Sequence, residues 1–141
     1  MIKKDTSEML AELQSCSDFK SFHESNRDIM IQKSLSELLS ELIEIHGIKK
    51  ADAIKRAEIN EIYAYQIFSG KRVPEKKKLL NLCIGMELSF EEIQSLLKVS
   101  GYAPLYAKNS FDCIIIHGIC KKMTVAEINY LLYDYGEETL S

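Results

Sequence analysis

The chain has 141 residues, of which 46% are hydrophobic and 28% charged, and its formal net charge is −3. This length allows one domain with a buried core, and the lack of Trp, with only six Gly and two Pro, favours an all-α fold. No apolar run approaches the roughly 18 residues that a membrane-spanning helix needs, and the N-terminus lacks the apolar core of a signal peptide. We therefore expect a cytoplasmic protein that does not enter a membrane.

The first 32 residues predict three short helical pieces, which we assign to an N-terminal helical extension. The first piece follows a capping box at Asp5–Glu8. The other two are marked by the hydrophobic pairs Phe19/Phe22 and Ile29/Met30. Helices this short are marginally stable alone, so they need to pack on the rest of the chain or on another subunit.

The next stretch predicts a helix and then a pair of short helices. A capping box at Ser34–Glu37 begins the first helix, and Gly47 is its natural left-handed end. Helices are then expected at 50–57 and 61–68, joined by a three-residue turn in which Asn60 is a good N-cap. The two helices belong to residues 47–80, which we take as the central stretch of the chain.

A further helix follows the break at Gly70. Pro74 is expected in its first turn, where the missing N–H costs nothing, and Gly85 is expected to end it.

Two later segments resemble each other at a spacing of 35 residues. Residues 89–102 and 124–137 share a capping box, matching apolar positions and a glycine stop, and the match extends upstream into the preceding helices. We therefore expect residues 105–136 to form a helical hairpin stacked on the one at 75–101. Residues 102–141 are assigned to this C-terminal helical hairpin, packed on the same core.

The cysteines, histidines and C-terminal tyrosines suggest structural roles. Without a Cys-x-x-Cys pair, the cysteines are interpreted as small buried hydrophobes and no metal site is expected. The tyrosines of the C-terminal hairpin are interpreted as packing residues. The residues concerned are Cys16, Cys83, Cys113, Cys120, His23, His46, His117, Tyr102, Tyr106, Tyr130, Tyr133 and Tyr135.

Positive charge is concentrated in the central stretch. Residues 47–80 carry nine basic and four acidic side chains, a net charge of +5, whereas residues 1–46 and 81–141 each have a net charge of −4. A basic middle between acidic ends indicates a partner of opposite charge. Cations that flank a pair of short helices suit contact with DNA phosphates, because an α-helix fits the major groove.

The candidate DNA-binding residues lie around the second helix of this pair. Those expected to contact phosphate are Lys49, Lys50, Lys71 and Arg72. Those expected to turn outward toward the DNA are Asn60, Glu61, Tyr65 and Gln66. Gln and Asn amides can read adenine edges, and Tyr65 can bond phosphate or pack on a thymine methyl. The three consecutive lysines at 76–78 point in different directions around a helix and are weaker candidates.

Residues 33–101 resemble the lambda-repressor-like, XRE-type helix–turn–helix family of bacterial transcriptional regulators. The resemblance rests on the two short helices, on Gly70-Lys71-Arg72-Val73-Pro74 after the second of them, and on the capped helix from Ser89. It implies a five-helix domain that binds double-stranded operator DNA, most often as a homodimer. The expected fold is thus an all-α, lambda-repressor-like domain with N-terminal helices and an added C-terminal hairpin.

Departures from the family pattern keep a second function open. Glu58 stands where the family usually has Gly, Glu61 would repel phosphate, and Ile62 is apolar at the head of the recognition helix. The main hypothesis is a DNA-binding transcriptional regulator. The alternative is a protein-interaction module that has lost sequence-specific DNA binding, with a protein partner on the C-terminal hairpin. No motif suggests an enzyme or a cofactor.

Overall fold

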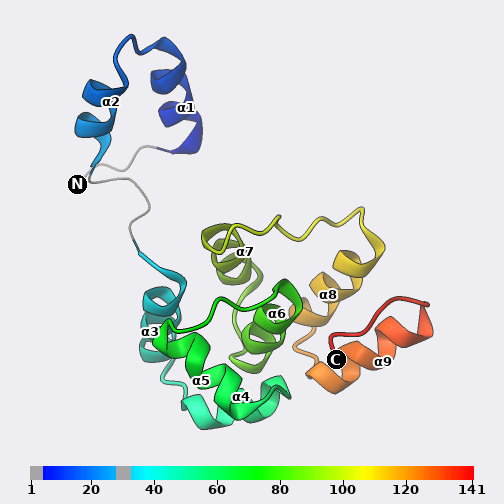
Figure 1. The fold of residues 1–141 in the computed structure, drawn as a ribbon. Coiled ribbons are helices and arrows are strands. Elements are labelled where there is room, and N and C mark those ends of the chain that lie inside the picture. The colour runs from blue at the N-terminus through cyan, green and yellow to red at the C-terminus, as the bar shows by residue number, and fades with distance from the viewer. Residues whose placement is uncertain (1–4, 28–32) are drawn as a thin grey trace. The chain divides into compact units, whose positions relative to one another are not determined.

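The computed structural model describes residues 5–27 and 33–141, which form nine α-helices and no strand (Figure 1). The prediction of an all-α fold is confirmed for these residues. The chain divides into two compact units, Met1–Gln32 and Lys33–Ser141.

The N-terminal unit contains α1 (Thr6–Ser15) and α2 (Phe19–Asn26). The Asp5 carboxylate caps α1 by accepting a hydrogen bond from the Glu8 N–H at 2.8 Å. The only buried hydrophobic side chain of α1 and α2 is Phe22. The expected helical turn around Ile29 and Met30 lies outside the described residues.

The second unit begins with five helices whose limits follow the sequence signals closely. Ser34 caps the first of them, and Gly47 ends it with a φ of 61°. Asn60 caps the third, as predicted, with its side-chain oxygen 3.0 Å from the Tyr63 N. The helices are α3 (Leu35–His46), α4 (Lys50–Ala57), α5 (Glu61–Ser69), α6 (Lys76–Gly85) and α7 (Phe90–Val99).

Helix α6 is the centre of this unit. Every residue from 79 to 85 is buried, and α6 contacts α4, α7 and α9 (Val125–Asp134). Helix α3 packs on α5 and α7. The side chains of His46 and Glu92 join α3 to α7 through a hydrogen bond of 2.7 Å. Burial would raise the pKa of the Glu92 carboxyl, but hydrogen bonds from the Ser89 N–H and His46 outweigh it, so this pKa is lowered.

Of the two sequence expectations about α6, the end at Gly85 is confirmed and the place of Pro74 is wrong. Gly85 is the last residue of α6, as expected, but the left-handed residue that follows the helix is Glu87, with a φ of 57°. Gly85 also allows α6 to approach α4, because a Cβ there would lie 2.4 Å from the Ala53 carbonyl oxygen. Pro74 lies before the N-cap residue Glu75, outside the first helical turn.

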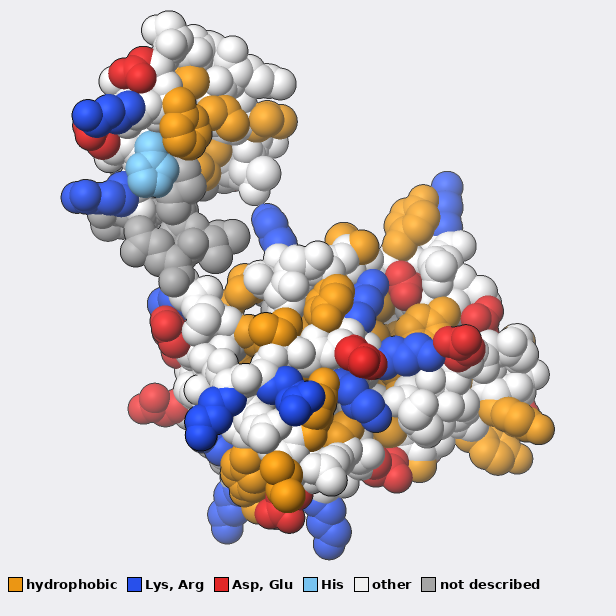
Figure 2. Space-filling model, viewed as in Figure 1, with side chains coloured by type: hydrophobic (Ala, Val, Ile, Leu, Met, Phe, Trp, Pro, Cys, Tyr) orange, Lys and Arg blue, Asp and Glu red, His pale blue; other side chains and the backbone are white. Residues whose placement is uncertain are grey.

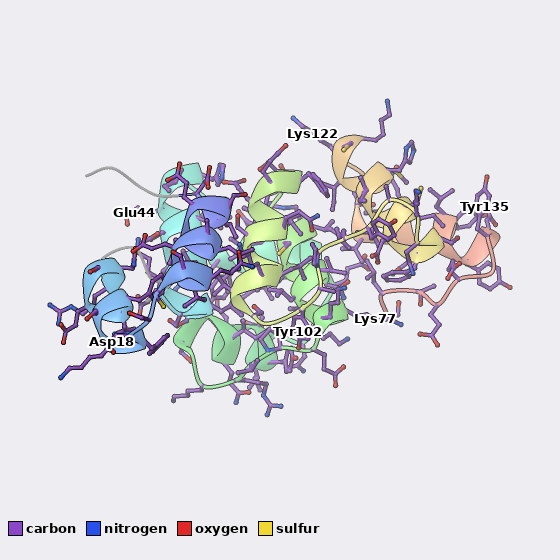
Figure 3. The ribbon with its side chains drawn as sticks, turned by 90° about the horizontal axis from the view of Figure 1, so that it is seen from above. Asp18, Glu44, Lys77, Tyr102, Lys122 and Tyr135 are labelled. Atoms are coloured by element: carbon purple, nitrogen blue, oxygen red, sulfur yellow. The ribbon has the colours of Figure 1, made fainter. Side chains whose placement is uncertain are left out.

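A hydrogen bond from a residue just after α7 holds the segment before α6. The Pro74 carbonyl accepts a hydrogen bond of 2.6 Å from the hydroxyl of Tyr102, which follows α7 and is labelled in Figure 3.

The internal repeat is present in three dimensions. Helices α8 (Ser110–Cys120) and α9 follow α6 and α7 with the same local geometry, and α7 contacts α8. Left-handed residues end α6 and α8, reciprocal capping boxes begin α7 and α9, and left-handed glycines follow both. The paired positions are Glu87 and Lys122, Ser89–Glu92 and Thr124–Glu127, and Gly101 and Gly136.

The repeat extends further than the sequence comparison indicated. The Gln94 side chain accepts a hydrogen bond from the Leu105 N–H at 2.8 Å and donates one to its carbonyl at 3.0 Å. The aligned residue Asn129 accepts from the Leu140 N–H at 2.7 Å. Leu105 and Leu140 are again 35 positions apart, and both are buried. Each copy therefore closes its hairpin by an amide side chain that holds the following loop.

The structural roles assigned to the cysteines and tyrosines are partly wrong. Cys83 is buried, and burial raises the pKa of its thiol to about 12, but Cys113 and Cys120 are exposed on α8. All four cysteines are free. Four of the five C-terminal tyrosines are exposed rather than packed in the hairpin: Tyr106, Tyr130, Tyr133 and Tyr135.

Replacing Gly85 by Ala should destabilise the protein by about 2 kcal/mol, because overpacking costs about 1–3 kcal/mol and the better helix propensity of Ala recovers only part of it. The atoms nearest to the added methyl are the Ala53 carbonyl oxygen and the Ala57 N, both backbone. Urea denaturation monitored by circular dichroism measures the change.

Gly118→Ala is the matched control. The nearest atom to its methyl group is Cγ1 of the buried Ile128, 2.5 Å away, and a side chain shifts more easily than backbone, so this variant should lose less stability than Gly85→Ala. Equal stabilities of the Gly85→Ala variant and the unsubstituted protein would contradict the close contact of α4 with α6.

Candidate nucleic-acid interface

Helix α5 presents one side to the core and the other to solvent. Ala64, Ile67 and Phe68 are buried in the hydrophobic core, and α5 rests on α3. The three-residue turn from α4 and the Asn60 cap set where α5 begins. The outward side of the helix is therefore fixed by both its ends and its buried side.

The predicted outward residues do lie on this side. Asn60, Glu61 and Tyr65 are exposed, and Gln66 is half-buried. The structure adds Ile62, which is 71% exposed. Its helical spacing with Tyr65 and Gln66 is the sequence signal that could have identified it. We call the surface formed by these residues and the exposed Ser69 the α5 face.

The four predicted phosphate-contacting cations are all exposed, and three of them, Lys50, Lys71 and Arg72, lie beside α5. The Lys50 ammonium lies 5.2 Å from the centre of the Phe68 ring, and the Arg72 guanidinium lies 5.3 Å from that of Tyr63. Cations at this distance from aromatic rings are held by the negative potential of the ring face. Lys50 and Arg72 are therefore positioned by residues of α5 itself.

A shallow depression of about 550 Å³ lies along the α5 face. It brings together five predicted site residues from α4, α5 and the loop after α5. Lys49, Asn60 and Arg72 do not line it. Figure 2 shows Lys and Arg side chains gathered around hydrophobic surface over α4 and α5. The predicted residues in the depression are Lys50, Glu61, Tyr65, Gln66 and Lys71.

The loop after α5 is tied to the helix end. Gly70 has a φ of 82°, and the N–H groups of Lys71 and Arg72 both donate to the Gln66 carbonyl, at 2.9 and 3.2 Å. The Arg72 Nε also donates to the Gln66 side-chain Oε1 at 2.9 Å. Because a guanidinium only donates, this bond identifies the oxygen of the Gln66 amide. The amide NH₂ remains as the group that can donate outward.

The three lysines at 76–78 are only partly exposed. The Lys77 ammonium pairs with Glu138 at 2.7 Å and lies 5.8 Å from the centre of the Phe111 ring, in contacts with the C-terminal part (Figure 3). Lys77 therefore packs against the C-terminal hairpin. Residues 76–78 remain weaker candidates for DNA contact than the four cations named above.

Comparison with known proteins finds no match to this chain among family models, curated proteins or solved structures. Within residues 5–27 and 33–141, no cluster of three or more His, Cys, Asp or Glu side chains could hold a metal ion. Of the described helices, none combines the length and the apolar character needed to cross a membrane.

The turn between α4 and α5 stores strain at Glu58, whose φ is 55° and ψ 41°. A left-handed residue with a Cβ costs about 1–2 kcal/mol, and the extra freedom of Gly in the unfolded chain offsets about 0.4–1 kcal/mol of that cost. Glu58→Gly should therefore raise the free energy of unfolding by about 0.5 kcal/mol. Glu58→Ala removes the same charge but keeps the Cβ, so it should give no gain. Equal effects of the two variants in urea denaturation would refute the strain.

Proposed function

We propose that this protein is a DNA-binding regulator of transcription, in which α4 and α5 act as a helix–turn–helix and α5 is the recognition helix. The observation that carries the proposal is the set of three exposed cations, Lys50, Lys71 and Arg72, beside the outward face of α5, in a chain whose other parts are acidic. A duplex has phosphates along both edges of its major groove, and cations beside a helix in that groove can contact them.

The proposed roles follow from where each residue stands. Lys49 and Lys50, at the start of α4, and Lys71 and Arg72, after α5, contact phosphates and supply affinity. The Gln66 amide faces base edges. The Ile62 side chain and the Tyr65 ring face them as well and can pack on thymine methyl groups.

A homodimer fits this proposal. One short recognition helix contacts few base pairs, and two copies read a longer, two-fold symmetric site.

A second candidate function is a protein-interaction module that uses the same α5 face. It is favoured by the exposed Ile62 and by the carboxylate of Glu61, which are at the head of the helix. A carboxylate there repels phosphate, and an exposed branched apolar side chain suits a protein surface.

Binding of a labelled mixed-sequence duplex, followed by fluorescence anisotropy at several salt concentrations, tests the first proposal. The slope of log K against log salt should be negative and should become shallower by roughly 1–2 in the double variants Lys49→Ala/Lys50→Ala and Lys71→Ala/Arg72→Ala, since each phosphate contact contributes about 0.9.

The control for this measurement is Lys121→Ala/Lys122→Ala, which removes the same charge between α8 and α9. Its slope should stay unchanged. Absence of binding at low salt, or equal losses in all three double variants, would reject DNA contact through the α5 face and favour the protein-interaction module.

The Arg72–Gln66 hydrogen bond predicts a base preference. With Oε1 engaged by Arg72, the Gln66 amide offers only its NH₂ to the acceptors of a guanine, whereas a free amide pairs with both N6 and N7 of adenine. Selection from a random duplex library should give guanine for the unsubstituted protein at one position. Arg72→Met should shift that position toward adenine, and Gln66→Ala should abolish the preference, which is worth about 1–3 kcal/mol. Selection of adenine by both the unsubstituted protein and Arg72→Met would refute this role of Arg72.

A further inference from the structure

The outward side of α9 carries tyrosines and carboxylates without any cation. Glu127, Tyr130, Tyr133 and Asp134 recur at helical spacing and are all exposed, the two tyrosines by 73% and 77%. Helix α9 contains no Lys, Arg or His. We call these four residues the α9 stripe. Figure 2 shows hydrophobic surface over α9, at the lower right of the view.

The internal repeat shows that the fold does not require these tyrosines. The residues of α7 that stand 35 positions before Tyr130 and Tyr133 are Ser95 and Lys98, and both are exposed. Helix α7 has the same capping box and the same amide contact to its following loop. The hairpin therefore forms with a small or a charged side chain at these two positions. The exposed aromatic surface of α9 is therefore additional to what its folding needs.

The α9 stripe belongs to a helix that is held in place by the core. Val125, Ile128 and Leu132 on the opposite side of α9 are buried in the core. The segment after α9 is held at Leu140, whose N–H donates to Asn129 at 2.7 Å and whose carbonyl accepts from Asn81 at 3.1 Å. A surface already held in one conformation loses little entropy on binding, which favours a docking role.

The charge along the α9 stripe indicates the chemistry of its partner. Carboxylates lie at both ends, and the two rings lie between them, over about 10 Å of helix length. A guanidinium can stack on an aromatic ring and pair with a carboxylate at the same time. A second copy of the stripe would instead bring four carboxylates together without a cation from either α9.

We propose that the α9 stripe docks a basic segment of a partner protein, whose arginine side chains stack on Tyr130 and Tyr133 and pair with Glu127 and Asp134. Tyr135, exposed at the end of α9 and labelled in Figure 3, extends the aromatic surface beyond Asp134. Lys122, labelled in the same figure, precedes the N-terminal end of α9. This surface shares no residue with the α5 face, so its role is independent of DNA binding.

The test measures binding of a fluorescein-labelled 12-residue peptide with four arginines at every third position, using the full chain and fluorescence anisotropy. A peptide with lysines at the same positions should bind several-fold more weakly, because lysine stacks and pairs less well. Tyr130→Ser/Tyr133→Ser should weaken arginine-peptide binding about tenfold. Glu127→Gln/Asp134→Asn should make binding less dependent on salt while keeping the α9 cap, since Gln also completes a capping box.

Matched controls separate the stripe from general attraction to an acidic chain. Tyr106→Ser changes an exposed tyrosine between α7 and α8, outside both proposed surfaces, and Glu44→Gln/Glu91→Gln neutralises two exposed carboxylates on α3 and α7. Both should keep the peptide affinity of the unsubstituted protein. The thermal unfolding of each variant verifies that it is folded.

Three outcomes would overturn the proposal. One is that the arginine peptide does not bind the unsubstituted protein at low salt. Another is that the control variants lose as much affinity as the stripe variants. The third is a dimer in sedimentation that Tyr130→Ser/Tyr133→Ser dissociates and the peptide does not, which would make a second copy the occupant. DNA binding should be unchanged in the stripe variants, so a failure of the DNA proposal would be seen separately.

Discussion

The close approach of α4 to α6 is the contact on which the arrangement of residues 33–141 depends. No side chain separates the two backbones at Gly85, and Ala53 and Ala57 face it from α4. The Arg56 Nε donates to the Gly85 carbonyl at 2.8 Å, which adds a polar tie beside the apolar contact. Because only three residues join α4 to α5, the position of α4 on α6 also limits where α5 can lie. The outward side of α5 is a consequence of this packing.

The repeated hairpin uses one set of backbone interactions twice and places different side chains on the outside. Capping boxes, left-handed links and amide contacts to the following loop recur in both copies. These interactions involve backbone groups that must be satisfied wherever a helix ends, so they restrict the sequence at a few positions only. The exposed positions are free to differ, and they do: Ser95 and Lys98 on α7 stand where Tyr130 and Tyr133 stand on α9.

The two proposed surfaces have opposite electrostatic character. The α5 face lies among lysines and an arginine, some of them held over aromatic rings, whereas the α9 stripe is acidic and aromatic. A duplex and a basic protein segment would each be attracted to one surface and repelled by the other. On these proposals, the charge separation along the chain keeps the two partners apart.

The sequence by itself determined the helices of the described chain and most of their ends, because capping residues and left-handed glycines act within one or two turns. It also determined that Asn60, Glu61 and Tyr65 share the outward side of one helix, since helical spacing alone places them there. Tertiary structure decided the rest. The sequence indicated that Gly85 ends a helix, but its close contact with Ala53 and Ala57 depends on α4, about thirty residues away in the chain. The pairing of Arg72 with Gln66 and the exposure of the α9 tyrosines likewise depend on which surfaces pack together, and local spacing carries no information about that choice.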